Sequence, residues 1–304
     1  MDMKATRTPR PAPAAPTRRP WSQERRLEFI DYRLRWNGRL NRADLIQFFD
    51  ISRPQASLDI AKYIELAPKN LEYDGTSKGY RPTRTFKPVF ASSDPARYLE
   101  HVLQRAEGLA GADQSFLAWA PPAATVPSPS RTVPASTLAA LVQAIHQGLG
   151  IDITYQSLTR PQPTQRTVSP HALAHDGFRW HVRAYCHSRG EFRDFVLARI
   201  VAIGAFGKAA AHSNEDADWA TLVVLRLAPH PKLPQGHRNA IELDYGMKGG
   251  QVEFKCRRAF LFYALRHLRL DEGVNDRSPQ EQQIVLLNQE EVFQALQGAG
   301  RRSS

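Results

Sequence analysis

The helix predicted to start near residue 53 carries side chains that can read the edges of DNA bases. Arg53 and Gln55 stand at its start, where the recognition helices of DNA-binding proteins usually meet bases. Leu58 lies on the outward side, where contact with a thymine methyl group would explain an apolar residue. The candidate DNA-binding residues of this helix are Ser52, Arg53, Gln55, Ser57, Leu58 and Lys62. For each residue taken singly, ordinary surface polarity is an equally good explanation.

A second group of candidates follows in the sequence LEYDGTSKGYRPT, which predicts a two-stranded hairpin tipped with Gly, Lys and Tyr. Lys78, Tyr80 and Arg81 lie on this hairpin, and we expect them to contact the DNA backbone. A helix beside a basic hairpin is typical of a winged helix-turn-helix. There the helix enters the major groove and the wing follows the flanking backbone. Double-stranded DNA is therefore the first partner to consider.

Three helices are expected to position these residues. Ser22 and Asn41 can cap the first two, and Ser52 begins a Ser-x-x-Gln capping box with Pro54 in the first turn. Asn37-Gly38 is expected to end the first helix. Apolar residues at helical spacing predict the buried faces: Leu27, Ile30 and Leu34, then Leu45, Ile46 and Phe49, then Ala56, Ile60, Tyr63, Ile64 and Ala67.

The charge distribution favours a polyanionic partner for the same segment. The chain of 304 residues has a net charge of +11. Residues 1–90 contain 18 Lys or Arg against 10 Asp or Glu, whereas the remaining residues contain 23 against 20. Binding of such a surface to nucleic acid is driven largely by counterion release. Charge alone fits a basic protein without a nucleic-acid role equally well, so the motif adds the decisive weight.

From residue 151 apolar and polar residues alternate, which predicts a small antiparallel sheet or barrel. On the segment 178–186, Arg179, His181 and Arg183 share one face, which cannot pack in a dry core without partners. Three interpretations of the arginines stay open: a pocket for an anion such as phosphate, a structural ion-pair network, or a solvated face. The group comprises Arg179, Arg183, Arg193 and Arg199, and the candidate network partners are Asp176, Glu191 and Asp194.

Metal binding is not expected, although four histidines fall within 17 residues. Their spacing does not match zinc sites, and the arginines beside His181 would repel a cation. We expect His171 and His181 to form hydrogen bonds in a pocket, and His175 and His187 to be exposed turn residues.

No motif for enzymatic catalysis is present, since the sequence has no phosphate-binding Gly-rich loop and no G-x-S-x-G. Two carboxylate pairs, at 216 and 218 and at 290 and 291, are expected on a solvated turn and a helix surface. We therefore expect neither an enzyme nor a cofactor. Cys186 and Cys256 fall in different regions, which indicates reduced thiols. No run is long enough for a membrane span, so a cytoplasmic, nucleoid-associated location is expected.

Five segments are expected along the chain, and together they indicate an α+β multidomain fold. They are a disordered basic arm at 1–20, a DNA-binding domain at 21–90, a helical and Pro-rich linker at 91–135, a β-rich domain at 136–212 and a small α+β domain at 213–304.

Several motifs give the chain a resemblance to WYL-domain transcriptional regulators. The signature tripeptide stands here as Trp180-His181-Val182, with only the tryptophan identical. The flanking pattern is better kept, in Tyr155-x-Ser157, Ser169-Pro170-His171 and Arg193-x-Phe195-x-x-x-Arg199-Ile200. The helix and hairpin sequences ISRPQASLDIAKYIEL and NLEYDGTSKGYRPT are similar to those of repressors associated with bacterial phage-defence systems of the BREX and CBASS kind.

This resemblance implies a winged helix-turn-helix, a ligand-sensing WYL domain built as an Sm-like antiparallel β-barrel at 136–212, and a C-terminal extension used in dimerisation. It also implies a small regulatory ligand, a nucleotide or an oligonucleotide. The expected ligand-binding residues are Tyr155, Ser157, His171, Arg179, His181, Arg183, Arg193, Phe195 and Arg199.

The first hypothesis is therefore a homodimeric repressor of a phage-defence operon, which binds an inverted-repeat operator and is controlled by the ligand. The alternative is a protein that binds or processes single-stranded nucleic acid through the barrel face. The residues do not distinguish an activator from a repressor, and they do not identify the operator, the ligand or the regulated genes.

Overall fold

The computed structural model describes residues 22–91, 94–109, 116–117, 119–127, 129, 131–271 and 277–298. The chain divides into two compact units, Met1–Ser128 and Pro129–Ser304. Each unit has its own hydrophobic core, and unit 2 has two of them. The basic arm expected at 1–20 lies outside the described residues.

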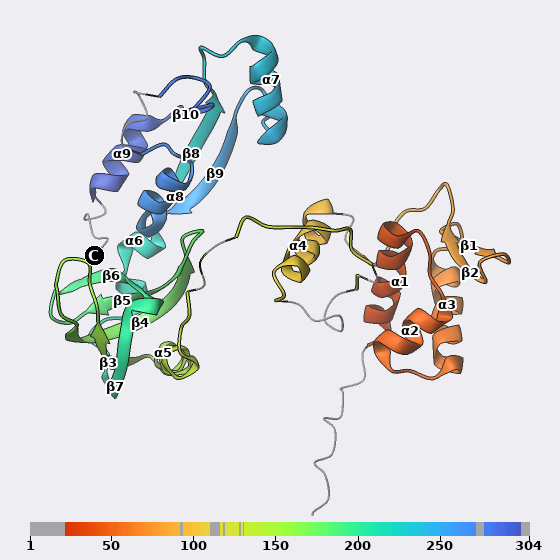
Figure 1. Cartoon of the computed structure of the whole chain (residues 1–304), viewed down its shortest axis with the longest axis horizontal. Coiled ribbons are helices and arrows are strands. Elements are labelled where there is room, and N and C mark those ends of the chain that lie inside the picture. The colour runs from red at the N-terminus through yellow and green to blue at the C-terminus, as the bar shows by residue number, and fades with distance from the viewer. Residues whose placement is uncertain are drawn as a thin grey trace, which may run out of the picture. The chain divides into compact units, whose positions relative to one another are not determined.

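Unit 1 is a three-helix bundle with a hairpin, as predicted for a winged helix-turn-helix (Figure 1). Ser22 Oγ accepts a hydrogen bond from the Arg25 backbone N–H at 3.3 Å and caps the first helix. Gly38 ends that helix with φ of 66°, a conformation that glycine adopts without strain. The elements are α1 Gln23–Asn37, α2 Arg42–Phe49, α3 Arg53–Leu66, β1 Leu71–Asp74, β2 Gly79–Pro82 and α4 Pro95–Ala106.

The core of unit 1 confirms most of the predicted buried faces. Leu27, Ile30 and Leu34 of α1 are all buried. On α3 the prediction for Ile64 is wrong, because its side chain is 39% exposed. The helices α1 and α2 both pack against α3, on the side that carries the buried Ala56, Ile60 and Tyr63. Asp59 lies on that covered side and is fully buried.

The segment after the wing packs into the same core. Phe116 contacts the rings of Phe29 and Phe48 at centroid distances of 5.2 and 5.3 Å. Tyr98 of α4 stacks on Trp36 of α1 at 4.5 Å. The region expected as a linker at 91–135 therefore contributes side chains to the hydrophobic core of unit 1.

Unit 2 begins with a helix that covers a five-stranded antiparallel sheet in the order β6-β5-β4-β3-β7. Gly150 allows β3 and β7 to approach closely, since a Cβ at this position would lie 2.7 Å from the Lys208 carbonyl oxygen. The described outer strands β6 and β7 do not pair, so no closed barrel is found among the described residues. The elements are α5 Ala135–Gln147, β3 Leu149–Tyr155, β4 Thr164–His175, β5 Trp180–Cys186, β6 Glu191–Val196, η1 Leu197–Arg199 and β7 Ile200–Lys208.

The C-terminal part of unit 2 is a mixed domain of helices and a three-stranded sheet in the order β10-β8-β9, as expected for a small α+β domain (Figure 1). Its core is separate from that of the five-stranded sheet. None of the described helices has the length and apolar character needed to cross a membrane. The elements are η2 Ser213–Glu215, α6 Ala217–Ala220, β8 Leu222–Pro229, α7 Gln235–Asp244, β9 Val252–Arg257, η3 Arg258–Phe260, α8 Leu261–His267, β10 Ile284–Leu286 and α9 Gln289–Gly298.

Candidate functional site

The exposed side of α3 presents the candidates that the sequence placed there. Ser52 caps the helix, because its Oγ accepts a hydrogen bond from the Gln55 backbone N–H at 3.3 Å. Arg53 is exposed in the first turn, and the Leu58 side chain is 63% exposed. Ser57 Oγ donates to the Arg53 carbonyl oxygen at 3.0 Å. The exposed side of α3 thus offers a partner a guanidinium and an apolar side chain that are five residues apart.

A buried carboxylate that sequence reasoning missed orients one of these candidates. Gln55 Nε2 donates to Asp59 Oδ1 at 3.1 Å, and Arg26 of α1 donates to Asp59 Oδ2 at 2.6 Å. The expected capping box is therefore only half formed. The Gln55 side chain binds Asp59 instead of returning to Ser52, since a charged acceptor makes the stronger hydrogen bond. The spacing of Asp59 from Ala56 and Tyr63, three and four residues, could have shown that it lies on the buried side.

Lys62 lies further along α3, where its ammonium group pairs with Glu65 at 3.0 Å on the surface. Surface ion pairs of this kind are weak, so the lysine remains available to a stronger anionic partner.

The wing combines a free tip with a rigid base. Lys78 is exposed at the tip with φ of 49°. Arg81 pairs with Asp74 at 2.6 Å across the hairpin. The hydrogen bond from the Ser77 hydroxyl, with those from the backbone and the charge of Arg81, holds the pKa of Asp74 below its usual range. This network supports the turn that presents Lys78.

The wing is joined to the helices through Tyr80. Its backbone exchanges two hydrogen bonds with Leu40, at 2.8 and 2.9 Å, and its ring packs against Tyr73. Tyr80, which the sequence suggested for DNA contact, therefore anchors the wing to the segment between α1 and α2.

The second candidate site lies in unit 2, where Arg183 of β5 is buried between two carboxylates. Its Nε and Nη2 atoms lie 2.7 and 3.1 Å from the two oxygens of Asp216, and its Nη1 lies 3.2 Å from Asp194. Asp216 is 1% exposed, so the expectation of a solvated turn is wrong. A buried guanidinium needs charged partners, and the segment between β7 and β8 provides the carboxylate of Asp216.

Asp216 also binds His171, which a β-bulge turns toward it. The pairing of β4 with β5 shifts between Pro170 and Ala172, so His171 is the extra residue. Its Nε2 lies 3.0 Å from Asp216 Oδ2. Burial opposes ionisation of Asp216. The hydrogen bonds from His171 and Arg183 outweigh it and hold the pKa of Asp216 well below its usual range.

His181, at the central position of the signature tripeptide, is buried against the C-terminal domain. Its Nε2 lies 2.9 Å from Asp176 Oδ2, and its ring lies 5.2 Å from that of Tyr263 in α8. Burial by itself would raise the pKa of Asp176. The hydrogen bonds that Asp176 accepts from His181 and from two backbone N–H groups outweigh this effect and hold its pKa well below the usual range. The Tyr263 hydroxyl donates to Asp194 at 3.3 Å. The sheet and the C-terminal domain are thus joined through polar side chains.

Of the three interpretations of the arginines, the structural network describes the observed partners of three of them. Arg179 pairs with Asp176 at 3.2 Å and Arg193 with Glu191 at 2.7 Å, in addition to Arg183 with Asp194. The Arg199 carbonyl accepts a hydrogen bond from the Gln156 backbone N–H.

Other expected ligand-binding residues serve the interior of the sheet. The Tyr155 hydroxyl accepts a hydrogen bond from the Val196 backbone N–H at 3.2 Å, and its ring packs edge-on against Phe195. Ser157 lies 3.2 Å from the Thr159 hydroxyl. His187 lies in a turn as expected, but it is half-buried rather than exposed, and its Nε2 lies 2.7 Å from Ser169 Oγ. The Nδ1 atoms of His171 and His181 and the Arg193 Nε atom are buried and have no hydrogen-bond partner among the described residues.

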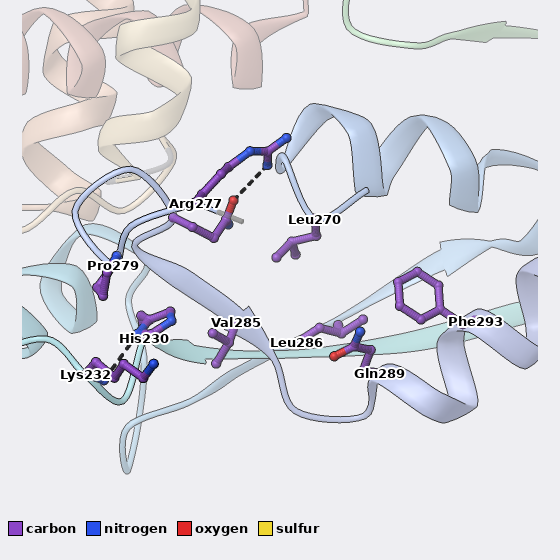
Figure 2. Close-up of a pocket in the computed structure, with 10 residues that line it drawn as sticks. His230, Lys232, Leu270, Arg277, Pro279, Val285, Leu286, Gln289 and Phe293 are labelled. Carbon is purple, nitrogen blue, oxygen red and sulfur yellow. Dashed lines mark hydrogen bonds between the residues drawn. The ribbon is translucent and has the colours of Figure 1, made fainter. Parts of the chain in front are cut away.

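A further cavity of about 200 Å³ lies in the C-terminal domain, between β10, α9 and the turn after β8 (Figure 2). Arg277 lines it but already pairs with Asp271 at 3.7 Å and donates to Gln282 at 3.0 Å. His230 Nδ1 accepts a hydrogen bond from the Lys232 backbone N–H. Because its principal cation is partnered, we assign no ligand to this cavity. No group of three or more His, Cys, Asp or Glu residues suited to a metal ion occurs within the described part of the chain.

Together, the three helices and the hairpin define a winged helix-turn-helix protein that carries two further domains. Three family models match the corresponding segments. The BrxR transcriptional regulator winged helix-turn-helix domain matches residues 22–104, the WYL domain matches 136–204, and the BrxR transcriptional regulator C-terminal dimerization domain matches 222–292. These matches confirm the resemblance that the sequence motifs indicated.

Relatives that match nearly the whole chain carry the name DNA-binding transcriptional repressor CapW. The protein of Pseudomonas aeruginosa is 48% identical over 277 residues, which cover 91% of this chain and 93% of the relative. That of Escherichia coli (strain KTE188) is 45% identical over 276 residues, covering 91% and 92%. That of Stenotrophomonas maltophilia is 44% identical over 275 residues, covering 90% and 92%. The chain belongs to the family of CapW repressors.

Proposed function

We propose that the protein is a homodimeric transcriptional repressor that binds an inverted-repeat operator in double-stranded DNA. The observation that carries this proposal is the start of α3. There Arg53 and Leu58 are exposed while Gln55 is held by the buried Asp59. A side chain whose rotamer is held in advance loses less entropy on binding, and this arrangement suits the reading of base edges. The names of the relatives agree with this function.

The dimer would be formed by the segment that matches a dimerization domain, residues 222–292. Two copies of α3 would then meet successive half-sites, whose separation the dimer geometry sets. By analogy with the defence-linked repressors, the regulated genes would be a phage-defence operon. The protein would act in the cytoplasm at the nucleoid.

Control by a ligand is the finer part of the proposal. The ligand would be nucleotide-like or an oligonucleotide, and it would bind at the sheet of unit 2, which would take the form of an Sm-like barrel. The buried, unpartnered atoms of His171, His181 and Arg193 support a polar ligand there. A ligand that competes for Asp216 or Asp194 would alter the contacts between the sheet and the C-terminal domain. Its effect on DNA binding is limited by its differential affinity for the two states.

The alternative, a single-strand binder that uses the face of this sheet, receives less support. Three of the arginines that would form its surface already pair with carboxylates, and Arg183 is buried. Their positive charge is therefore largely neutralised before a polyanion arrives.

The test is a mobility-shift titration of the full chain against the duplex DNA upstream of its own gene cluster and against random duplexes. We expect a preference of at least about a thousandfold for a duplex with an inverted repeat at moderate salt. Equal affinity for all duplexes would contradict the proposal.

A further inference from the structure

A cavity of about 290 Å³ lies in unit 1 at the junction of α1 and α2. This volume is near the lower end for small-molecule sites, roughly 300–1,000 Å³. The C-terminal end of α1 provides one wall, the start of α2 another, and Trp119 closes the side. The lining residues are Arg33, Trp36, Asn37, Arg39, Asp44 and Trp119.

The wall of this cavity contains a buried guanidinium with few partners. Arg33 is only 7% exposed, and its Nε atom has no hydrogen-bond partner among the described residues. The guanidinium lies over the Phe29 ring at 4.5 Å. Burial lowers the pKa of Arg33, although the charge of Asp44 opposes this shift. A charge held in this way is costly unless an anion approaches it, and a guanidinium fork suits a phosphate.

The other walls provide complementary chemistry. Trp119 is 63% exposed, so one face of its indole is open to stacking, whereas Trp36 is already covered by Tyr98. Asn37 Oδ1 is buried without a hydrogen-bond partner among the described residues, and it can accept a hydrogen bond. Asp44 provides a carboxylate, of which one oxygen accepts from the Asn41 backbone N–H at 2.7 Å. The cavity thus offers two guanidinium groups, an aromatic face and acceptors for hydroxyl or amino groups.

We propose that this cavity binds a nucleoside monophosphate, with the phosphate at Arg33 and Arg39 and the base on Trp119. Asp44 and Asn37 accept hydrogen bonds from the ribose hydroxyls or the amino group of the base. Inorganic phosphate would leave the tryptophan and the acceptors unused. A phosphate of the DNA backbone has the same chemistry. It would meet exposed cations more readily than a guanidinium as buried as Arg33.

The cavity is coupled to the wing through the residue after Arg39. Leu40 exchanges both backbone hydrogen bonds with Tyr80, and a Cβ on Gly79 would lie 2.4 Å from Asn41 Oδ1. A ligand that binds Arg39 would therefore also restrain Leu40, the residue whose backbone supports the wing. An effect of the ligand on the wing rests on the proposed DNA binding, whereas binding of the nucleotide to the cavity does not.

The experiment is isothermal titration of the full chain with AMP, adenosine and inorganic phosphate. Arg33→Gln and Trp119→Leu test the cavity. The matched controls are Arg105→Gln, an exposed arginine of α4, and Trp180→Leu, a tryptophan in unit 2 that is 52% exposed. Thermal unfolding shows that each variant is folded, and the exposed position of Trp119 keeps the test valid if Arg33→Gln does not fold.

We expect AMP to bind at least about tenfold more tightly than adenosine or phosphate, and both cavity variants to weaken AMP by at least about tenfold while the controls do not. A random duplex, titrated separately, is expected to bind Trp119→Leu as well as it binds the unaltered chain. The inference fails if AMP does not bind, if its binding survives both cavity variants, or if phosphate binds as tightly. It also fails if Trp119→Leu weakens the duplex instead of AMP, because the cavity would then serve the DNA backbone. If the unaltered chain binds AMP but shows no preference for an operator, only the proposed function is contradicted.

Discussion

Arg53 at the start of α3 and Arg183 in β5 both stand on the polar face that the sequence pattern predicts, but the structure gives them opposite surroundings. Arg53 is exposed in the first turn of its helix. Arg183 is only 5% exposed, and its guanidinium donates hydrogen bonds to two carboxylates. An exposed cation costs little and is free for a polyanion, whereas a buried one must be neutralised within the protein.

The polar groups of the two regions are therefore expected to contribute to different properties of the protein. The polar groups of the sheet join two parts of unit 2, so altering them is expected to change stability first. The polar groups of α3 and the wing contribute little to stability, so altering them is expected to change DNA binding first. Asp59 is the exception, because it is buried in unit 1 and also orients Gln55, a candidate for DNA contact.

The largest effect is expected for Asp216→Ala. The substitution removes the carboxylate that Arg183 and His171 share, and Arg183 keeps Asp194 as a partner. Breaking a buried ion pair costs up to about 3–5 kcal/mol. Urea unfolding of unit 2 measures the loss. The matched control is Glu253→Ala, which breaks a surface pair with Arg226 and should cost less than about 1 kcal/mol. Equal costs for the two variants would remove the distinction between the buried and the exposed arginines.

Arg53→Ala should act on specificity rather than on stability. A guanidinium that reads a base contributes about 1–3 kcal/mol of discrimination, so the variant should tolerate substitutions at one operator position. Competition with a panel of single-base operator variants gives the measurement. Arg105→Ala, an exposed arginine of α4, is the control and should leave the panel unchanged. If the panel responds alike to both variants, Arg53 does not read a base.

Acid should destabilise unit 2 through Asp176. The pKa of this carboxyl is depressed in the folded state, so its contribution is complete above its unfolded pKa of about 3.9 and is lost as the pH falls below that value. The loss is on the order of 1 kcal/mol for each unit of depression. Urea unfolding at pH 5 and pH 3 should therefore show a smaller loss for Asp176→Asn than for the unaltered chain. Parallel losses would show that His181 does not hold this carboxylate ionised.

The smallest effect is expected for Lys78→Ala at the tip of the wing. A lysine that meets a phosphate adds affinity without sequence preference, so all duplexes should bind less tightly by a similar factor. The slope of log K against log salt should fall by about 1. Lys248→Ala, an exposed lysine in unit 2, should leave the slope unchanged. A change in operator preference would instead assign Lys78 to base reading.

Much of unit 1 could be predicted from local patterns. Ser22 and Ser52 cap helices as their positions indicated, and the wing forms the two-stranded hairpin that its sequence predicted. Caps and turns depend on residues that are close in the chain, so their chemistry is visible in the sequence. The exposure of Ile64 was not visible, because it depends on which residues of α3 the neighbouring helices cover.

The site in unit 2 was predictable only in part. The requirement that Arg183 have a partner followed from its place in an amphipathic strand, and Asp194 was among the candidates. Asp216 was not among the candidates, because it lies 33 residues away in the segment between β7 and β8, whose sequence has no regular hydrophobic pattern. The bulge at His171 also depends on the pairing of two strands, which no local signal revealed.

By itself the sequence determined the winged helix-turn-helix, the period of the sheet and the family, because capping residues, hydrophobic spacing and motifs act over short distances along the chain. Only the tertiary structure decided which charged side chains are neutralised and which stay available. That choice depends on desolvation and on partners brought together from distant segments: Asp59 with Arg26 in unit 1, and Asp216 with Arg183 in unit 2.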